Sequence, residues 1–319
     1  MKLRTIPAKA YARDVLPLTA PLWAGRRSFE QYVAQTHELA ASAYGRRHYR
    51  TVGLYDGRRL VASFKRYERA IRDGSGVLRA IGFGAVFTPG ELRGRGYASF
   101  MLASALDAAR HDGYDVAYLF SDIRPQFYAA LGFRTLPSRE LTLRADALPS
   151  ERLQIASLGR PDTAAVRRCF ERAEVRRGSA FVRDEATWRW IATRIGHGSE
   201  HRLGHATNLA VRRGRGVCAY VFGARVPERD AYVFDEFGFS DDAAAAIVPA
   251  LLRAAAGDLR RVAGWLPPDG ARQTLPKGTT RKRNGATLMM APLGGNGERL
   301  IETLFSKANA DFTWATDHV

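Results

Sequence analysis

The residues with the clearest chemical meaning form a loop rich in glycine and arginine. An apolar run ends at Val86-Phe-Thr88, and the loop that follows contains Arg93-Gly-Arg-Gly96. From Tyr97 onwards, apolar residues recur at helical spacing. The first N–H groups of a helix lack internal partners, glycine admits an anion close to the backbone, and arginine adds charge-assisted hydrogen bonds. We therefore predict a phosphate cradle made of Arg93, Gly94, Arg95, Gly96, Tyr97 and Ala98.

A second arginine- and glycine-rich stretch shows why the surroundings of this pattern matter. Arg212-Arg-Gly-Arg-Gly-Val-Cys218 lies between two β-rich runs, at 208–212 and 217–222, and no helix follows it. A turn between two strands offers no helix dipole to an anion. We therefore interpret this second stretch as a hairpin turn.

The order of elements after the first loop carries a family resemblance. The helix is expected to end near Gly113, and a short apolar strand follows at 116–120. Next come Ser121-Asp-Ile-Arg-Pro125 and Gln126-Phe-Tyr-Ala-Ala-Leu-Gly-Phe133. A strand, an R-x-x-G-x-A loop, a helix, a strand and then Tyr-x-x-x-Gly-Phe resemble the GNAT superfamily of acyl-CoA-dependent N-acyltransferases. The residues around these motifs resemble those of bacterial tandem-GNAT proteins and, in the first half of the chain, those of fungal lysine N6-acetyltransferases.

The resemblance implies a function and a way of holding the co-substrate. Acetyl-CoA would enter between two splayed parallel strands, 80–88 and 116–121, and the cradle would bind its pyrophosphate. The backbones of Val86, Phe87 and Thr88 would bond the pantetheine arm, with a bulge that aims an N–H at the thioester oxygen. Ser121 and Asp122 would contact pantetheine or acceptor. The expected reaction is direct acetyl transfer, in a ternary complex, to a primary amine of a lysine-like or polyamine-like small molecule or side chain.

Proton transfer is assigned less completely than cofactor binding. Tyr128 matches the family's acid, and a phenol of pKa about 10 can protonate a leaving thiolate of pKa about 8.5. No carboxylate stands on the strand at 80–88 where many relatives carry a glutamate base. Tandem relatives can use the C-terminal carboxylate, so Val319 or Asp317 is the candidate base, and a chain of waters is the alternative. We expect His318 on the surface.

The second half of the chain repeats the order of elements without the cradle. Its counterpart of the loop is Phe239-Ser-Asp-Asp242, in which Asp241 and Asp242 suit helix caps and would repel a pyrophosphate. We predict an α/β (α+β) tandem GNAT fold with mixed twisted sheets flanked by helices. Residues 1–148 would be the catalytic domain, and 149–319 a degenerate copy that completes the acceptor site. We therefore expect each chain to bind one CoA, in its first half.

Composition narrows the classes of partner. The chain has 319 residues, a net charge of +17 spread over both halves, and two cysteines. A nucleic-acid binder more often concentrates its positive charge, so nucleic acid is not the expected ligand. There is no apolar run long enough for a membrane helix and no zinc-like spacing, and His197, His201 and His205 are placed in a loop. We expect a cytoplasmic enzyme without a metal; homo-oligomer formation is left open.

Two other functions fit the same residues. One is transfer of a longer acyl group from acyl-CoA to a peptide or natural-product amine. The other is a non-catalytic acyl-CoA-binding module. The presence of Arg93, Gly96 and Tyr128 together favours catalysis.

Overall fold

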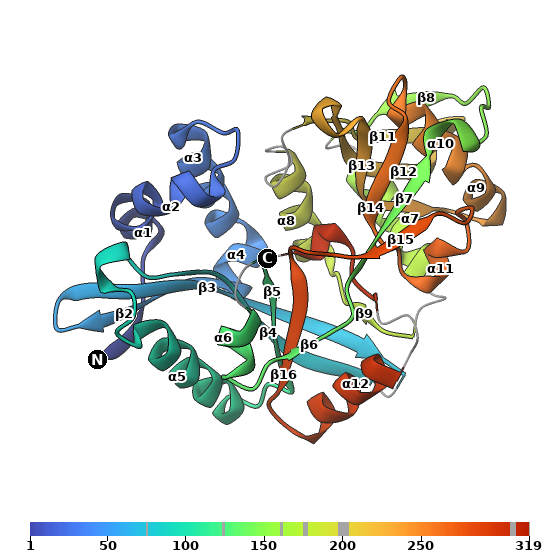
Figure 1. The fold of residues 1–319 in the computed structure, drawn as a ribbon. Coiled ribbons are helices and arrows are strands. Elements are labelled where there is room, and N and C mark those ends of the chain that lie inside the picture. The colour runs from blue at the N-terminus through green and yellow to red at the C-terminus, as the bar shows by residue number, and fades with distance from the viewer. Residues whose placement is uncertain are drawn as a thin grey trace.

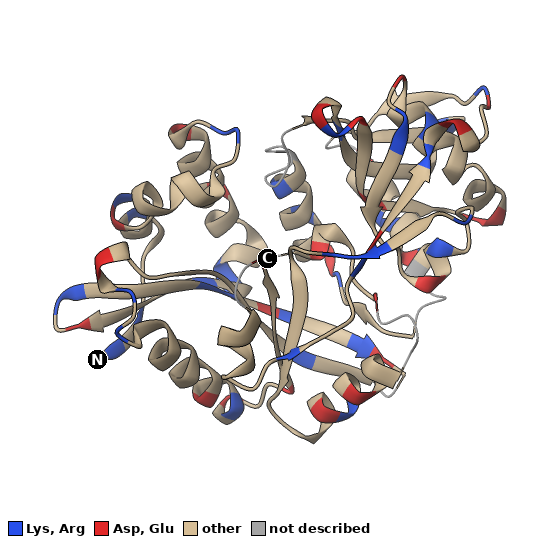
Figure 2. Ribbon diagram, viewed as in Figure 1, with Lys and Arg blue, Asp and Glu red and all other residues tan. Residues whose placement is uncertain are grey.

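The computed structural model contains two separate mixed β-sheets, one at the lower left and one at the upper right of Figure 1. It describes residues 1–74, 76–122, 125–159, 162–174, 178–196, 204–306 and 311–318. Across this part of the chain, no helix is both long and apolar enough to cross a membrane. Lys and Arg are spread over both sheets rather than gathered on one element, as expected (Figure 2).

The first sheet is assembled mainly from the N-terminal half. Its order is β1 (Lys2–Thr5), β2 (Tyr49–Asp56), β3 (Arg59–Asp73), β4 (Gly76–Phe87), β5 (Val116–Ser121), β16 (Thr287–Pro292) and β6 (Arg134–Thr135), with β9 (Ala180–Phe181) paired to β3. The β2–β3 hairpin turns at Gly57, whose φ of 60° is left-handed and therefore suits glycine.

The second sheet is assembled mainly from the C-terminal half. Its order is β15 (Thr279–Lys282), β7 (Arg139–Arg144), β14 (Arg261–Trp265), β13 (Ala231–Phe239), β12 (Gly216–Val226), β11 (Leu209–Arg213) and β8 (Ile155–Ser157), with β10 (His205–Ala206) paired to β12. The turn between β11 and β12 is the second arginine–glycine stretch, which confirms its interpretation as a hairpin.

The two sheets share one topology. In the first, β2-β3-β4-β5-β16 pair antiparallel, antiparallel, parallel and antiparallel in turn. In the second, β11-β12-β13-β14-β7 repeat that pattern. The tandem fold predicted from the sequence is therefore confirmed.

The last strand of each repeat comes from the other half of the chain. Strand β7 precedes residue 148 yet lies in the second sheet, and β16 lies after it yet pairs with β5 in the first. The division into 1–148 and 149–319 stays a prediction about domains. The sheet topology shows in addition that each half contributes one strand to the sheet of the other half, across the boundary at residue 148.

Helices cover both faces of the first sheet (Figure 1). On one face, α5 (Tyr97–His111) buries its apolar stripe against β3, β4 and β5. Across the other lie α1 (Ala8–Asp14), α2 (Leu16–Trp23), α3 (Phe29–Ala41) and α4 (Ala43–His48). The sequence Ser28-Phe-Glu-Gln31 is typical of a capping box, and it opens α3 as one, since each side chain bonds the other's backbone N–H.

The remaining helices belong to the second sheet and to the junction between the two. They are α6 (Pro125–Ala129), α7 (Thr163–Glu174), α8 (Glu185–Gly196), α9 (Asp242–Ala246), α10 (Val248–Ala256), α11 (Asp269–Arg272) and α12 (Gly295–Ser306). Helix α10 occupies in the second repeat the place of α5 in the first, whereas α12 packs on β16. Helix α8 contacts α3 and α4 across the junction, so the second half helps to wall the first sheet.

Candidate active site

Strands β4 and β5 separate after a short parallel ladder. Their last paired residues are Gly82 and Tyr118, although β4 runs on to Phe87 and β5 to Ser121. Beyond that point β5 pairs only with β16, so the β4 edge facing it has no strand partner among the described residues. A gap of this kind can accept an extended ligand through backbone hydrogen bonds.

A bulge interrupts β4 at the mouth of this gap. Opposite β3, Phe87 pairs with Ser63 and Gly84 with Lys65, so β4 carries one residue more than its partner. Within the bulge Ala85 has a φ of 47°, which is rare for a residue with a Cβ. The bulge predicted from the family resemblance is present. It redirects the backbone where Val86 and Phe87 begin the edge predicted to bind pantetheine.

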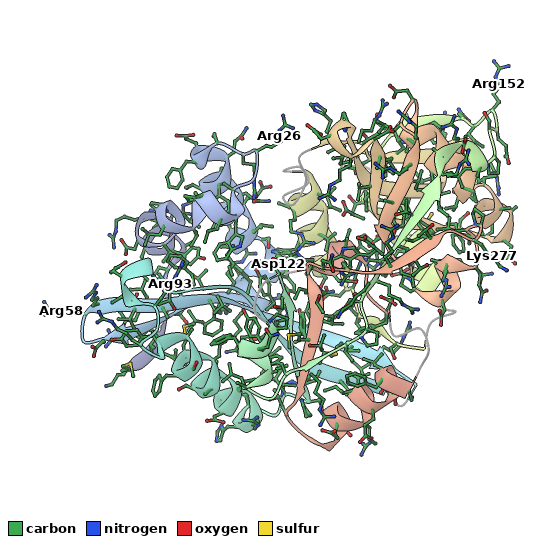
Figure 3. All side chains as sticks on the ribbon, viewed as in Figure 1. Arg26, Arg58, Arg93, Asp122, Arg152 and Lys277 are labelled. Atoms are coloured by element: carbon green, nitrogen blue, oxygen red, sulfur yellow. The ribbon has the colours of Figure 1, made fainter. Side chains whose placement is uncertain are left out.

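The predicted cradle has the backbone of an anion site. Gly94 and Gly96 both adopt left-handed φ angles, 78° and 77°, and α5 begins at Tyr97. Gly96 is the helix N-cap and supplies no side-chain hydrogen bond, so the first N–H groups of α5 keep no cap from within the loop. Arg93 and Arg95 are exposed beside them. The Arg93 Nε donates to the Thr88 carbonyl at 3.2 Å, which joins the cradle to the end of β4 (Figure 3).

A cavity of about 660 Å³ lies at the open end of the gap. Its floor includes Gly84, Ala85 and Val86 of β4, and Asp122 and Tyr128 line it from the chain after β5. Its other walls come from α2, α3, α8 and the C-terminal segment, together with side chains of β2, β3 and β5. The structure therefore brings the bulge, Asp122 and Tyr128 to one space. The sequence placed these residues in order along the chain but did not indicate that α2, α3 and α8 would enclose them.

Tyr128 stands on α6 with its ring held by two phenylalanines. Its centroid lies 5.0 Å from that of Phe127 and 6.2 Å from that of Phe133, both edge to face. Burial raises the pKa of the Tyr128 phenol, and the nearby Asp122 carboxylate raises it further. The phenol therefore stays protonated at neutral pH. Among the described residues, its hydroxyl donates no hydrogen bond to another side chain or backbone group.

Ser121 and Asp122, predicted as one contact site, have different surroundings. Ser121 is buried in β5 opposite Thr287 of β16 and is not among the residues that line the cavity. Asp122 lies near the middle of the molecule (Figure 3), where its Oδ1 accepts the Ala286 N–H at 2.8 Å. Asp122 is thus the member of the pair that reaches the cavity.

The C-terminal segment enters the site, but not in the way predicted for Asp317. That carboxylate is buried and accepts from Arg183 at 2.9 Å, from Arg69 at 3.2 Å and from the Trp314 N–H at 3.1 Å. It is absent from the cavity lining. Because three donors already surround it, Asp317 is a structural anion, and its assignment as a candidate base is wrong.

His318 corrects a second expectation. It is 8% exposed rather than on the surface, with its ring 5.1 Å from Phe120 and 6.1 Å from Trp265, and it lines the cavity. Arg194 of α8 donates to the carbonyls of His318 and Thr316, which fixes the segment. The predicted base Val319 follows directly in the chain and lies outside the described residues.

An ionic network behind the cavity links the two sheets. Arg183, which follows β9, donates to Glu236 of β13 at 2.7 Å as well as to Asp317. Tyr220 of β12 donates to the other Glu236 oxygen at 2.5 Å, and Thr316 also bonds this carboxylate. Arg183 and Glu236 have no exposed side-chain surface. Sequence reasoning missed this network, because its members are far apart in the chain and belong to no motif.

The second repeat differs at the start of its helical segment between β13 and β14, which consists of α9 followed by α10. Asp241 is the N-cap of α9, and its Oδ1 accepts the Ala244 N–H at 2.7 Å. That backbone hydrogen bond is the main reason that the pKa of Asp241 is lowered. A carboxylate of the protein therefore occupies the helix N-terminus, as the sequence predicted. The described residues contain no cluster of His, Cys, Asp and Glu suited to a metal, and His197 and His201 lie outside them.

Comparisons with known proteins agree with this geometry. Residues 22–136 match the family model described as the acetyltransferase (GNAT) domain. No curated protein matches the sequence. Among solved structures, a GCN5-related N-acetyltransferase from Kribbella flavida is 18% identical with a TM-score of 0.65, over 93% of this chain and 73% of that one.

Two further structures are similar over nearly the whole chain. A tandem GNAT protein from the clavulanic acid biosynthesis pathway is 14% identical, with a TM-score of 0.53 over 92% of this chain and 98% of that one. Saccharomyces cerevisiae N-myristoyltransferase with bound myristoyl-CoA is 10% identical, with a TM-score of 0.55 over 91% and 78%. Residues 22–136 therefore match the acetyltransferase (GNAT) domain, and the whole chain shares its fold with solved GNAT structures, a tandem GNAT protein among them.

Proposed function

We propose that this protein transfers an acetyl group from acetyl-CoA to a primary amine. The observation that carries the proposal is that the bulge at the end of the β4–β5 gap and Tyr128 line one cavity, while the cradle at α5 follows β4 in the chain. A thioester laid along the β4 edge from the cradle would reach that cavity at the bulge. Residues 1–148 are proposed as the catalytic unit and 149–319 as the degenerate copy that completes the acceptor site.

In the proposed reaction, each residue group has one task. The α5 N-terminus with Arg93 and Arg95 binds the pyrophosphate, and the backbone at 86–88 bonds pantetheine. The bulge at Ala85 turns an N–H toward the thioester oxygen, where negative charge develops as the amine nitrogen attacks the carbonyl carbon. When the carbon–sulfur bond breaks, the electron pair leaves on sulfur and Tyr128 supplies its proton.

The acceptor ammonium must first lose a proton. We propose the terminal carboxylate of Val319 as the base, because Arg194 holds the preceding carbonyl of His318 at the cavity wall. Water that reaches Asp122 is the alternative route. Both leave the amine neutral before attack, as the chemistry requires.

The direct test is release of free thiol from acetyl-CoA with a panel of primary amines. Tyr128→Phe keeps the ring packing and removes the proton, so kcat should fall about 100-fold while acetyl-CoA affinity stays unchanged. Tyr55→Phe is the matched control, since Tyr55 lies on β2 outside the cavity lining. Equal kcat for wild type and Tyr128→Phe would remove the tyrosine from the mechanism.

A second candidate is transfer of a longer acyl group. The cavity is larger than an acetyl group needs, and its volume of about 660 Å³ favours this candidate. Comparing acetyl-CoA with octanoyl-CoA as donors, at one amine concentration, distinguishes the two. A module without catalytic activity would bind CoA and release no thiol with any donor.

A further inference from the structure

One wall of the cavity is built from aromatic side chains. Six of them come from α2, α3, β2, β3, β5 and α8: Trp23, Tyr32, Tyr49, Tyr67, Phe120 and Trp190. Part of this wall is packed without any ligand, because Tyr67 lies 5.3 Å from Tyr49 and 5.9 Å from Trp190 between ring centroids. The rings therefore present a preformed apolar surface of the kind that binds flat or broad groups.

This wall begins at the reaction centre. Tyr67 pairs across the sheet with Gly82, the last β4 residue that pairs with β5. Lys65, two residues earlier on the same face of β3, pairs with Gly84 at the bulge. A group attached close to the attacking nitrogen would therefore meet the aromatic wall directly.

The charges in the lining oppose a second positive charge on the acceptor. Lys65 and Arg194 are the cationic side chains among the described lining residues, and Asp122 is the carboxylate. Arg194 is held in place by the carbonyls of Thr316 and His318, so it does not swing away. A diamine or polyamine would bring an extra ammonium into a cavity whose lining already has two cations and one carboxylate, at a cost that a monoamine avoids.

A long acyl chain fits the same wall less well. Gln35, Thr36 and Lys65 interrupt the apolar lining with polar groups; Gln35 accepts from Arg27 and Thr36 donates to the Tyr32 carbonyl, and a saturated acyl chain offers these groups no further hydrogen bond. An aromatic amine can instead place its ring edge or a hydroxyl next to these groups while its face lies on the wall.

We infer that the acceptor is a monoamine carried by an aromatic or similarly broad apolar group, not a polyamine. This inference rests on the proposed acyltransferase function. Phenethylamine, tyramine and tryptamine should have a kcat/KM at least tenfold above those of n-butylamine, cadaverine and spermidine, measured by thiol release at fixed acetyl-CoA. Polyamines equal to or better than the aromatic amines would overturn it.

Two substitutions test the wall itself. Trp23→Leu should reduce the preference for tryptamine over n-butylamine at least fivefold, with acetyl-CoA affinity unchanged by calorimetry. Phe29→Leu is the matched control, because Phe29 is exposed at the start of α3 and is not part of the lining. Lys65→Met should improve cadaverine relative to phenethylamine. An unchanged preference in both lining variants would contradict the inference.

Failure of the inference and failure of the proposed function give different results. If acetyl-CoA binds but no amine, aromatic or aliphatic, releases thiol, the acyltransfer proposal fails. If thiol is released with polyamines preferred, only the acceptor class is wrong. If octanoyl-CoA is strongly preferred and the aromatic preference vanishes with it, the wall holds the acyl chain, and the inference is likewise wrong.

Discussion

Glu236→Gln is the sharpest test of how the second sheet supports the site. Glu236 and Asp317 together balance Arg69 and Arg183, and all four side chains are 2% exposed or less. The amide keeps the shape of the carboxylate but leaves one buried guanidinium uncompensated. Breaking a buried ion pair by neutralising one partner costs about 3–5 kcal/mol of unfolding free energy. For a chain of this size that corresponds to a fall in Tm on the order of 10 °C.

Calorimetric unfolding without ligand measures this loss, and urea unfolding gives the free energy independently. Because Glu236 also bonds Thr316 and Arg183 holds Asp317, the variant should loosen the segment that ends in His318. We therefore expect kcat to fall even at temperatures where the variant is fully folded. Asp146→Asn is the control, since the exposed Arg144–Asp146 pair should leave Tm unchanged. A Tm shift as small as that of the control would refute the assignment of Glu236 as a buried counter-ion.

The remaining predictions concern the site and its assay. Gly96→Asp, which adds a carboxylate and strains a left-handed φ, and Arg93→Ala should each weaken CoA binding at least tenfold by calorimetry, with one CoA bound per chain; two sites would contradict the degenerate repeat. Since the pKa of Tyr128 is raised, its alkaline limb in kcat should lie above about 10 and vanish in Tyr128→Phe; a limb near neutrality would exclude it as the acid. Deleting Val319 alone should lower kcat and spare CoA affinity; full activity would exclude its carboxylate. Burial raises the pKa of the Cys169 thiol to about 12, so native protein should react slowly with disulfide reagents and quickly in guanidinium; rapid native labelling would show the thiol to be accessible.

Local signals predicted local structure well. The capping box at Ser28, the hairpin at Gly57 and the left-handed Gly96 before α5 are each decided by a few neighbouring residues, and each is present. Strand β3 is longer than its hairpin partner β2, because it pairs with β4 as far as Asp73 and with β9 at Ile71 and Arg72. The partner of Arg69, Asp317, lies in the second half of the chain and could not be predicted from local sequence.

Long-range features were beyond the sequence. The sequence of an isolated apolar strand such as β16 does not indicate which sheet edge the strand joins, so its pairing with β5 could not be predicted. The walls of the cavity could not be predicted for the same reason, since Trp190 and Arg194 lie on a helix with no recognisable motif. His318 was expected on the surface, because only the fold reveals the rings of Phe120 and Trp265 that cover it.

The exchanged strands have a consequence for synthesis on the ribosome. Strand β5 is buried at every residue in the finished protein, yet its partner β16 begins roughly 165 residues later. At about 5–20 residues per second, the nascent first sheet waits roughly 10–30 s with an apolar edge unpaired. Such an edge is a template for pairing with other chains. The protein's yield in a cell should therefore depend on elongation rate and on chaperones that shield β5 until the last tenth of the chain emerges.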